Sequence, residues 1–444
     1  MEYNKFKFKD LFEISHGYPF KSSDFSNEKT NFYVMTPGNV KIGGGIKLDK
    51  IKYLRKDTEF DKNYIFKPND IFINMTDLSK KGDTLGFPAI IPDDINNFYL
   101  HNQRLGRILN INEYRINKNY LFYLLCTREY RHHILSSATG STVKHTSPKR
   151  ILEFEVSLPN LNIQKYIGGL LNKIDKKIII NKNIIANLEE LSQTLFKRWF
   201  VDFEFPDKDG NPYKSSGGEM IDSELGKIPL NWNVNVLKNI ADVRTGYAFK
   251  SSEYIYSSKL SVLRTLNISK TSCLIEMNNL KFVSNDYINI PKYNKYSLEI
   301  FDTLLVTVGG SIGNIGIITE SNLPSLQNQN MWRFRTLNSK INNLLIYNII
   351  KIINKNVSNQ TSGSAREFYT KKVFENFKIA LPNLNHPMLL KANQIHSNLF
   401  KNISNLNKET NNLVKLRDTL LPKLMSGEIE IPDDIEVNTD ELSF

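Results

Sequence analysis

The sequence contains two copies of one unit, and this repetition constrains the architecture more than any other feature. The run Gly-Tyr-Pro-Phe-Lys-Ser-Ser at 17–23 returns as Gly-Tyr-Ala-Phe-Lys-Ser-Ser at 246–252, 229 positions later, with six of seven residues identical. Leu-Pro-Asn-Leu-Asn at 158–162 returns unchanged at 381–385, 223 positions later. Between these anchors, Asn102-Gln103 has its counterpart in Asn328-Gln329. Because the order is kept while the spacing drifts, we predict two copies of one fold that differ mainly in their loops.

Each copy is predicted to consist of an α+β domain followed by a long helix. Short runs rich in β-branched and apolar residues, such as Ile71–Met75 and Thr303–Val308, alternate with Gly and Asn turns, which is typical of a small α+β domain. The Pro of the repeated Leu-Pro-Asn-Leu-Asn ends a strand, and its Asn residues can cap the helix that follows. The predicted fold class is therefore α+β, with two tandem domains alternating with two long helices.

The two predicted helices carry matching apolar stripes. No proline occurs from Ile163 to Phe200, and the first stripe, interrupted by Asn181 and Ser192, consists of Leu171, Ile174, Ile178, Ile185, Leu188, Leu195 and Trp199. A shift of 225 positions gives the second stripe, His396, Leu399, Ile403, Leu406, Thr410, Leu413, Arg417, Leu420 and Leu424. Alternating spacings of three and four residues indicate a coiled-coil seam, in which a polar residue sets the register. We predict that the helices, each roughly 55 Å long, pair within the chain as an antiparallel coiled coil.

Changes in composition mark the boundaries between the parts. A stretch rich in Pro, Gly, Asn and Ser from Asp202 to Asn231 is typical of a linker. We expect a first domain at 1–158, a helix at 159–203, a linker at 204–231, a second domain at 232–381, a helix at 382–427 and an acidic tail at 428–444 that crosses back or frays.

Charge and hydrophobicity restrict the class of protein. The formal net charge of +12, with a pI of about 9.3, favours an anionic partner such as nucleic acid. A composition rich in Ile, Asn and Lys offers a second explanation for the surplus lysine, so charge alone does not decide. The sequence has no long uncharged apolar run and begins with a polar segment, so we expect a cytoplasmic, non-membrane protein. The distant Cys126 and Cys273 are expected to be free, buried thiols.

Motifs for catalysis are missing from the sequence. The glycine-rich run Gly309–Gly316 lacks the lysine of a phosphate loop, so we interpret it as a turn between strands. The sequence contains no Glu-x-Lys of a carboxylate-metal nuclease, and Asn211-Pro212-Tyr213 has one proline fewer than the loop of an adenine methyltransferase. The seven histidines show no metal-ligand spacing. We therefore expect no catalytic residue and no metal site, and a binding protein rather than an enzyme.

Together these motifs resemble the specificity (S) subunits of type I restriction-modification systems. The resemblance covers almost the whole chain. The motifs that carry it are Gly-Tyr-x-Phe-Lys-Ser-Ser and Leu-Pro-Asn-Leu-Asn in both halves, Gly310–Gly313, the segment from Leu188 to Phe205 with Lys197–Phe200, the linker run Gly210–Ser216, and Gly226–Trp232. The first half departs from the pattern, because Gly82–Gly86 replaces the Gly-Ser-Ile-Gly of the second half.

The resemblance implies a non-catalytic, DNA-binding subunit. Its two target recognition domains would each read one half of an asymmetric, bipartite DNA site, and its helices would fix the unread gap between the halves. Two modification subunits would bind this chain and methylate adenine with S-adenosylmethionine. Two restriction subunits that use ATP and Mg would be able to join them, while this chain would hold no cofactor. The differing glycine loops imply that the two domains read different sequences.

We expect loops near the repeated motifs to contact double-stranded DNA, because Arg, Lys and Asn bind phosphates and base edges and Tyr can stack. The candidates in the first domain are Tyr18, Lys21, Asn39, Lys144, His145, Lys149 and Arg150, and those in the second are Tyr247, Lys250, Asn267, Arg366, Tyr369, Lys371 and Lys372. The alternatives are ordinary solvated side chains or, for Gly-Tyr-x-Phe, local packing. Trp199 either closes the helix seam or binds a partner.

Two other functions fit the same features. One is a stand-alone DNA-binding protein with two reading domains and no methyltransferase partner. The other is a coiled-coil adaptor without DNA affinity, whose basic charge reflects composition alone. Co-purification of a methyltransferase and the salt dependence of DNA binding would separate the three.

Overall fold

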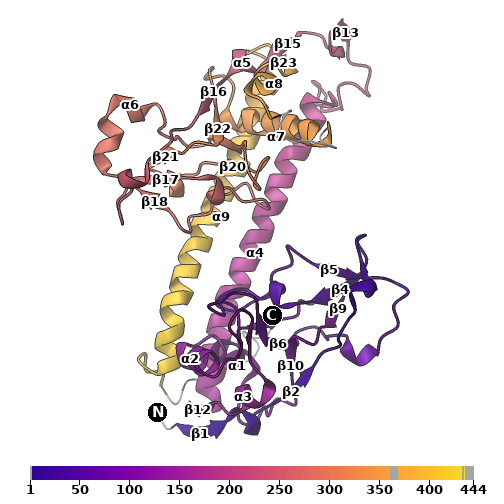
Figure 1. Ribbon diagram of the computed structural model, residues 1–444. Helices are drawn as coiled ribbons and strands as arrows, with labels where there is room; N and C mark the ends of the chain where they lie inside the picture. Colours follow the sequence, from indigo (N-terminus) through magenta and orange to yellow (C-terminus); the bar gives the residue numbers. More distant parts are fainter. Residues whose placement is uncertain (1–2, 361–368, 433–434, 436–444) are drawn as a thin grey trace. The chain divides into compact units, whose positions relative to one another are not determined.

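The computed structural model describes residues 3–360, 369–432 and 435 of the chain (Figure 1). The chain divides into two compact units, one made of residues 1–178 with residues 413–444 and the other of residues 179–412. Two helices of 40 residues each, α4 (Leu161–Phe200) and α9 (Pro387–Ser426), contribute to both units.

The first unit is built on two four-stranded sheets. Its strands are β1 (Asn4–Lys7), β2 (Glu13–His16), β3 (Phe25–Ser26), β4 (Phe32–Met35), β5 (Lys52–Leu54), β6 (Ile71–Asn74), β7 (Thr76–Asp77), β8 (Pro88–Ile90), β9 (Phe98–His101), β10 (Leu105–Leu109), β11 (Lys144–His145) and β12 (Glu155–Leu158). The central sheet has the order β2-β10-β6-β8 and the outer sheet the order β3-β5-β4-β9. Within these two sheets only β4 and β9 pair in parallel. Two smaller ladders, β1-β12 and β7-β11, complete the unit.

The central sheet separates two apolar cores. Ile71 and Ile73 face helices α1 (Lys118–Leu124) and α2 (Arg128–Ser136), whereas Phe72 between them faces the outer sheet, as the two-residue period of a strand requires. The first core also contains residues of α4 and α9, among them Leu171 and Leu424. Residues Ile429, Ile431 and Ile435 of the acidic tail pack into the same core. The described part of the tail therefore crosses back onto the first unit.

The second unit repeats this topology. Its strands are β13 (Met220–Ser223), β14 (Gly226–Pro229), β15 (Trp232–Val236), β16 (Ala241–Thr245), β17 (Ser261–Leu263), β18 (Lys281–Phe282), β19 (Thr303–Val306), β20 (Ile315–Ile317), β21 (Ser325–Gln327), β22 (Met331–Thr336) and β23 (Lys378–Pro382). Besides α4 and α9, its helices are α5 (Leu237–Ile240), α6 (Pro291–Asn294), α7 (Asn343–Gln360) and α8 (Lys371–Glu375). The order β16-β22-β19-β20 matches β2-β10-β6-β8, and β18-β17-β21 matches β5-β4-β9, including its one parallel pair. The predicted duplication is confirmed at the level of strand order.

The predicted linker contains a hairpin that the sequence did not suggest. Strands β13 and β14 pair antiparallel across Glu224 and Leu225. Gly226, which follows the turn, has a φ of 87°, a value that glycine adopts without strain. The apolar Met220 and Ile221 are adjacent in β13, and β14 contains Gly and Pro, so the two-residue alternation that would have revealed these strands is absent.

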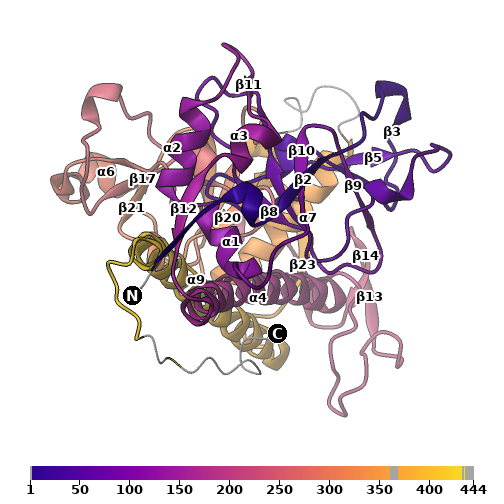
Figure 2. The same ribbon diagram turned by 90° about the horizontal axis from the view of Figure 1, so that it is seen from below.

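Helices α4 and α9 pack against each other, as Figures 1 and 2 show. In the first unit, Arg417 donates to Asp175 at 2.7 Å. In the second unit, Asn181 donates to Glu409 at 2.8 Å. The residue numbers of the contacts on α9 decrease as those on α4 increase, so the two helices are antiparallel, as predicted.

The seam also contains a buried histidine. Ser192 Oγ lies 2.9 Å from His396 Nδ1, and Asn348 of α7 donates to the same Oγ at 3.2 Å. The hydroxyl can accept from Asn348 and also donate to the imidazole when Nδ1 carries no proton. Burial lowers the pKa of His396 from 6.5 to about 4, which favours the same neutral form.

His396 should make the stability of the second unit depend on pH. Its pKa is about 4 when folded and about 6.5 when unfolded, so the unfolded chain binds the proton more readily. The free energy of unfolding should therefore fall as pH drops from about 6.5 to about 4, by up to ~3 kcal/mol. Tryptophan fluorescence can follow this in urea, because Trp199, Trp232 and Trp332 all lie in the second unit.

His396→Gln retains a polar group for Ser192 and removes the titration, so most of this pH dependence should disappear. The exposed His132→Gln, in the first unit, serves as the control. Equal pH profiles for His396→Gln and the unchanged chain would contradict the assignment.

Candidate nucleic-acid interface

Two short helices at equivalent places of the repeat carry predicted DNA contacts. α3 (Pro148–Leu152) begins after the capping Ser147 and carries Lys149 and Arg150, immediately before β12. α8 begins after the capping Thr370 and carries Lys371 and Lys372, immediately before β23. The lysines are exposed and Arg150 is half-buried. Both units therefore present basic residues at the same topological position.

In the first unit, strand pairing brings further basic residues to this place. β11 pairs with β7, so that Lys144 lies opposite Asp77 and His145 opposite Thr76. His145 Nδ1 lies 3.2 Å from Thr76 Oγ1. The loop after β7 adds the exposed Lys80 and Lys81, which the sequence analysis did not select although they form a Lys-Lys pair beside a glycine. We call Lys80, Lys81, Lys144, His145, Lys149 and Arg150 the first basic cluster.

The loop that carries Lys80 and Lys81 is held by a buried carboxylate. Asp77 accepts hydrogen bonds from Ser79 N at 2.7 Å and from the hydroxyl of Thr84 at 2.7 Å. Burial alone would raise the pKa of Asp77, but these hydrogen bonds outweigh it and hold the pKa below its usual value. Among the described residues, no carboxylate forms an ion pair with a member of the first basic cluster. Its charge is therefore available to an anionic partner.

The second unit places a different loop at the same position. Between β19 and β20, Gly309 and Gly310 are exposed with no neighbouring atom where a Cβ would lie. The far end of the loop is fixed, because Asn354 of α7 donates to Gly313 O at 3.0 Å and Tyr369 donates to Asn354 at 2.6 Å. Tyr369 is buried, so it positions the loop instead of facing solvent. Arg366, the remaining candidate of this region, lies outside the described residues.

The repeated Gly-Tyr-x-Phe-Lys-Ser-Ser is explained mainly by packing. A Cβ at Gly17 would lie 2.4 Å from the Asn102 backbone, and one at Gly246 would lie 1.9 Å from Asn328 O, so only glycine fits. Tyr18 packs against Phe20 and Tyr64 with ring centroids 4.9 and 5.3 Å apart.

The second copy packs in the same way. The ring centroid of Tyr247 lies 4.9 Å from that of Phe249 and 5.1 Å from that of Tyr293. The side chains of Lys21 and Lys250 are exposed. Their backbone N–H groups donate to the carboxylates of Asp24 and Glu253, which cap the short turns that follow the lysines. Of the DNA-contact candidates in this motif, the two lysines are the ones whose side chains are exposed.

The two asparagine candidates are buried inside their loops. Asn39 accepts from Thr36 N at 2.9 Å and donates to Lys47 O at 3.1 Å. Asn267 accepts from Arg264 N at 3.0 Å and donates to Glu276 O at 2.9 Å. Both side chains are 0% exposed. Their place three residues after the residue whose N–H they bind is the signal that could have identified them as caps.

A buried carboxylate connects the second α+β domain to α4. Glu189 accepts from Tyr347 at 2.6 Å, from Lys351 at 3.2 Å and from Cys273 N at 3.0 Å. Burial alone would raise the pKa of Glu189, but Lys351 and these hydrogen bonds lower it below its usual value. Both cysteines are free, and burial raises the pKa of the Cys273 thiol.

Among the described residues, no group of three or more His, Cys, Asp or Glu side chains could hold a metal ion. The helices of the described ranges include none with the length and hydrophobicity that crossing a bilayer requires.

Comparisons with known proteins agree on one family. Residues 1–190 and 229–416 match the family model described as a type I restriction modification DNA specificity domain. The chain is 26% identical over 319 residues to the type I restriction enzyme MjaIX specificity subunit of Methanocaldococcus jannaschii, covering 71% of this chain and 69% of that protein. It is 21% identical over 415 residues to the HindI specificity subunit of Haemophilus influenzae, covering 79% and 87%.

A solved structure agrees with the fold. The type I restriction-modification S subunit from M. genitalium covers 98% of this chain with 97% of its own length, at a TM-score of 0.57 and 17% identity. This likeness concerns the arrangement of helices and strands.

Proposed function

Because this chain belongs to the type I restriction-modification DNA specificity family as a non-catalytic specificity subunit, we propose that its two units each read one half of a bipartite, asymmetric DNA site. Residues 1–158 and 232–381 are the two target recognition domains in this proposal. The adaptor and stand-alone alternatives lose their support, since the whole repeat matches one family of DNA specificity subunits.

One observation carries the proposal. Both units expose basic residues on a short helix at the same topological position, beside the loops 78–84 and 307–314. These loops lead into the same turn, at Gly82–Gly86 and Gly309–Gly313, but carry different side chains. Lysine and arginine bind phosphates without regard to sequence, whereas loop side chains read base edges. Two domains that read different half-sites require basic residues for phosphate binding at the same position and loops with different side chains.

The first basic cluster should contribute to DNA affinity. Replacing Lys144 and Lys149 with Gln would remove two phosphate contacts, so the slope of log affinity against log salt concentration should fall by roughly 2. Lys182→Gln with Lys401→Gln, which changes two exposed lysines of the long helices, is the matched control. An unchanged slope in the first variant would remove the cluster from the interface.

The long helices are proposed to set the unread gap between the half-sites. Asn181 contacts Glu409, so a heptad inserted after Asn181 needs a matching heptad after Lys408 to keep the pairing in register. The double insertion adds roughly 10 Å of helix and should lengthen the gap by about three base pairs. Sequencing of methylated adenines in the host would measure this, and altered half-sites would contradict it.

Two modification subunits are the proposed partners, and they would methylate adenine with S-adenosylmethionine. Restriction subunits, with ATP and Mg, would add cleavage. Two copies of one partner need two similar surfaces, and the repeat offers a pair: Leu191 of α4 and Leu416 of α9 lie 225 positions apart and are 45% and 47% exposed. Apolar side chains with this much exposed surface are candidates for an interface.

Leu191→Asp and Leu416→Asp should each release one modification subunit, and the double variant should release both. Native mass spectrometry of the complex, expressed with its neighbouring genes, gives the stoichiometry. Ile95→Asp, which changes a 94% exposed residue elsewhere, should leave two subunits bound. Retention of both subunits by the double variant would exclude these surfaces.

A further inference from the structure

Two glutamines occupy equivalent, exposed positions in the two units. Gln103 lies between β9 and β10, and Gln329 lies between β21 and β22, each as the second residue of the repeated Asn-Gln pair. Within the part of the chain that the structure describes, neither side-chain amide has a hydrogen-bond partner. The fold therefore does not use these two side chains, and their identity in both copies needs another explanation.

In the first unit, the repeated motifs hold the backbone of this loop. Tyr18 O accepts from Gln103 N at 3.2 Å, and Arg104 O accepts from Met75 N at 3.0 Å. The buried Asn102 side chain accepts from Arg104 N at 3.1 Å. Asn102 thus supports the loop itself, whereas the neighbouring Gln103 side chain remains exposed and unpaired.

The second unit has the same backbone contacts. Tyr247 O accepts from Gln329 N at 2.9 Å, and Asn330 O accepts from Thr307 N at 3.0 Å. The Asn328 side chain accepts from Gln329 N at 2.6 Å. Both units therefore hold the backbone on either side of the glutamine and leave its side chain free.

The glutamine loops adjoin the loops that are proposed to read DNA. In the first unit, Met75 N donates to Arg104 O and Met75 O accepts from Thr146 N, each at 3.0 Å. Thr146 lies between members of the first basic cluster. Figure 2 shows β10, β11 and α3 on the side of the first unit away from α4. In the second unit, Thr307 is the first residue of the loop 307–314.

A shared side chain on a shared frame suits a feature that both half-sites have in common. In the proposed function, on which this step rests, two modification subunits methylate adenine in a site of two halves, so an A·T pair is such a feature. The amide of glutamine offers a donor and an acceptor. These match N7 and the N6 amino group of adenine, whereas a contact with phosphate oxygens would leave the amide carbonyl unpaired.

We propose that Gln103 and Gln329 each bind an adenine at equivalent places in the two half-sites, through two hydrogen bonds to its major-groove edge. The loops beside them, which carry different side chains, then read the bases that differ between the half-sites. The two units thus share one base contact and differ in the others.

Binding to substituted DNA tests these contacts. The complex with its modification subunits is purified, and its site is obtained by sequencing methylated adenines in the host. Synthetic duplexes then carry one replaced base pair, at each position of the site in turn. For the unchanged complex, replacement of the contacted A·T pair in either half-site should weaken binding by roughly tenfold or more.

The two glutamine variants should each lose the effect of one replacement. In Gln103→Ala, replacing the contacted pair of the first half-site should cause no further loss of affinity, while the second half-site behaves as before. Gln329→Ala should show the reverse. Because glutamine carries no charge, the slope of log affinity against log salt concentration should stay the same in both variants.

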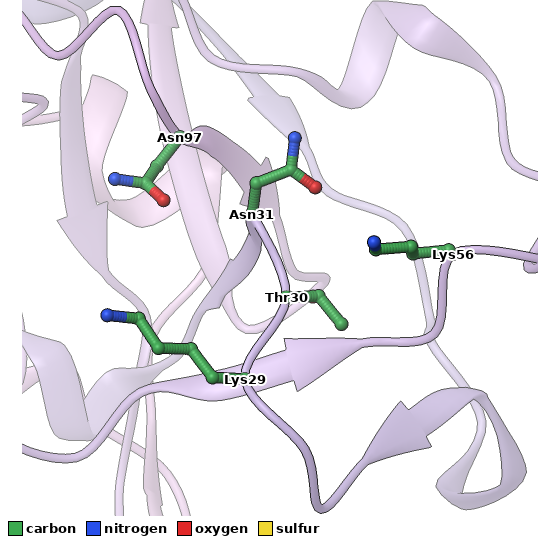
Figure 3. Close-up of a pocket in the computed structure, with 5 residues that line it drawn as sticks. All are labelled: Lys29, Thr30, Asn31, Lys56 and Asn97. Carbon is green, nitrogen blue, oxygen red and sulfur yellow. The ribbon is translucent and has the colours of Figure 1, made fainter.

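Asn31 supplies the matched control. It lines a pocket of about 360 Å³ in the outer sheet together with Lys29, Thr30, Lys56 and Asn97 (Figure 3). Figure 3 shows the Lys29 amino group directed away from Lys56, so these lysines do not converge on one ligand. Asn31→Ala removes a half-buried amide from the same unit, and every replaced base pair should keep its effect. Circular dichroism verifies the folding of each variant.

A full effect of every replacement in both glutamine variants would overturn the proposal. That outcome includes equal weakening of binding to all duplexes, which loss of a phosphate contact would cause. Loss of the effect at a pair other than A·T would overturn the assignment to adenine. Failure of the proposed function would look different, because the unchanged complex would then bind no DNA sequence in preference to another.

Discussion

The antiparallel packing of α4 against α9 is the interaction on which both units depend. In the first unit, Leu171 of α4 and Leu424 of α9 belong to the same core as Tyr120 of α1. In the second unit, Phe196 of α4 and Phe400 of α9 belong to the core that contains most of α7. Neither α+β domain completes its core without both helices. An apolar seam alone tolerates several registers, whereas contacts such as that between Arg417 and Asp175 form in one register only.

The two domains bind the helix pair by different polar contacts. In the first unit, Asp175 of α4 accepts from Tyr123 at 2.7 Å as well as from Arg417. In the second, Glu189 accepts from Tyr347, Lys351 and the Cys273 backbone. Loss of their partners would be costly for the half-buried Asp175 and the buried Glu189, so each domain fits its own place on the helices. The asymmetric DNA site that we propose would need such an ordered pair of readers.

The sequence predicted the architecture because duplication and heptad spacing are long-range patterns that many residues share. Asn181 and Ser192 could be recognised as polar seam positions, but their partners Glu409 and His396 depend on which residues meet across the helices. The chemistry of Asn39 suits a base edge, which is why the sequence predicts a DNA contact, and the same amide chemistry suits the cap that Asn39 forms. The residue type cannot separate these roles, since both need the same donors and acceptors. The exposure of the side chain in the folded protein separates them.

Comparison of the two copies separates structural residues from candidate reading residues. Gly17 and Gly246 are identical because the Asn102 and Asn328 backbones leave no space for a Cβ, and such a constraint is the same in both halves. DNA reading has the opposite requirement, because two half-sites of different sequence need different side chains on a common frame. Loops such as 78–84 and 307–314, which follow the equivalent strands β6 and β19 but differ in their side chains, are therefore where recognition is expected to diverge. In a duplicated reader, identity between buried positions of the copies marks the frame, and difference at equivalent surface positions marks the contact with the part of the ligand that differs.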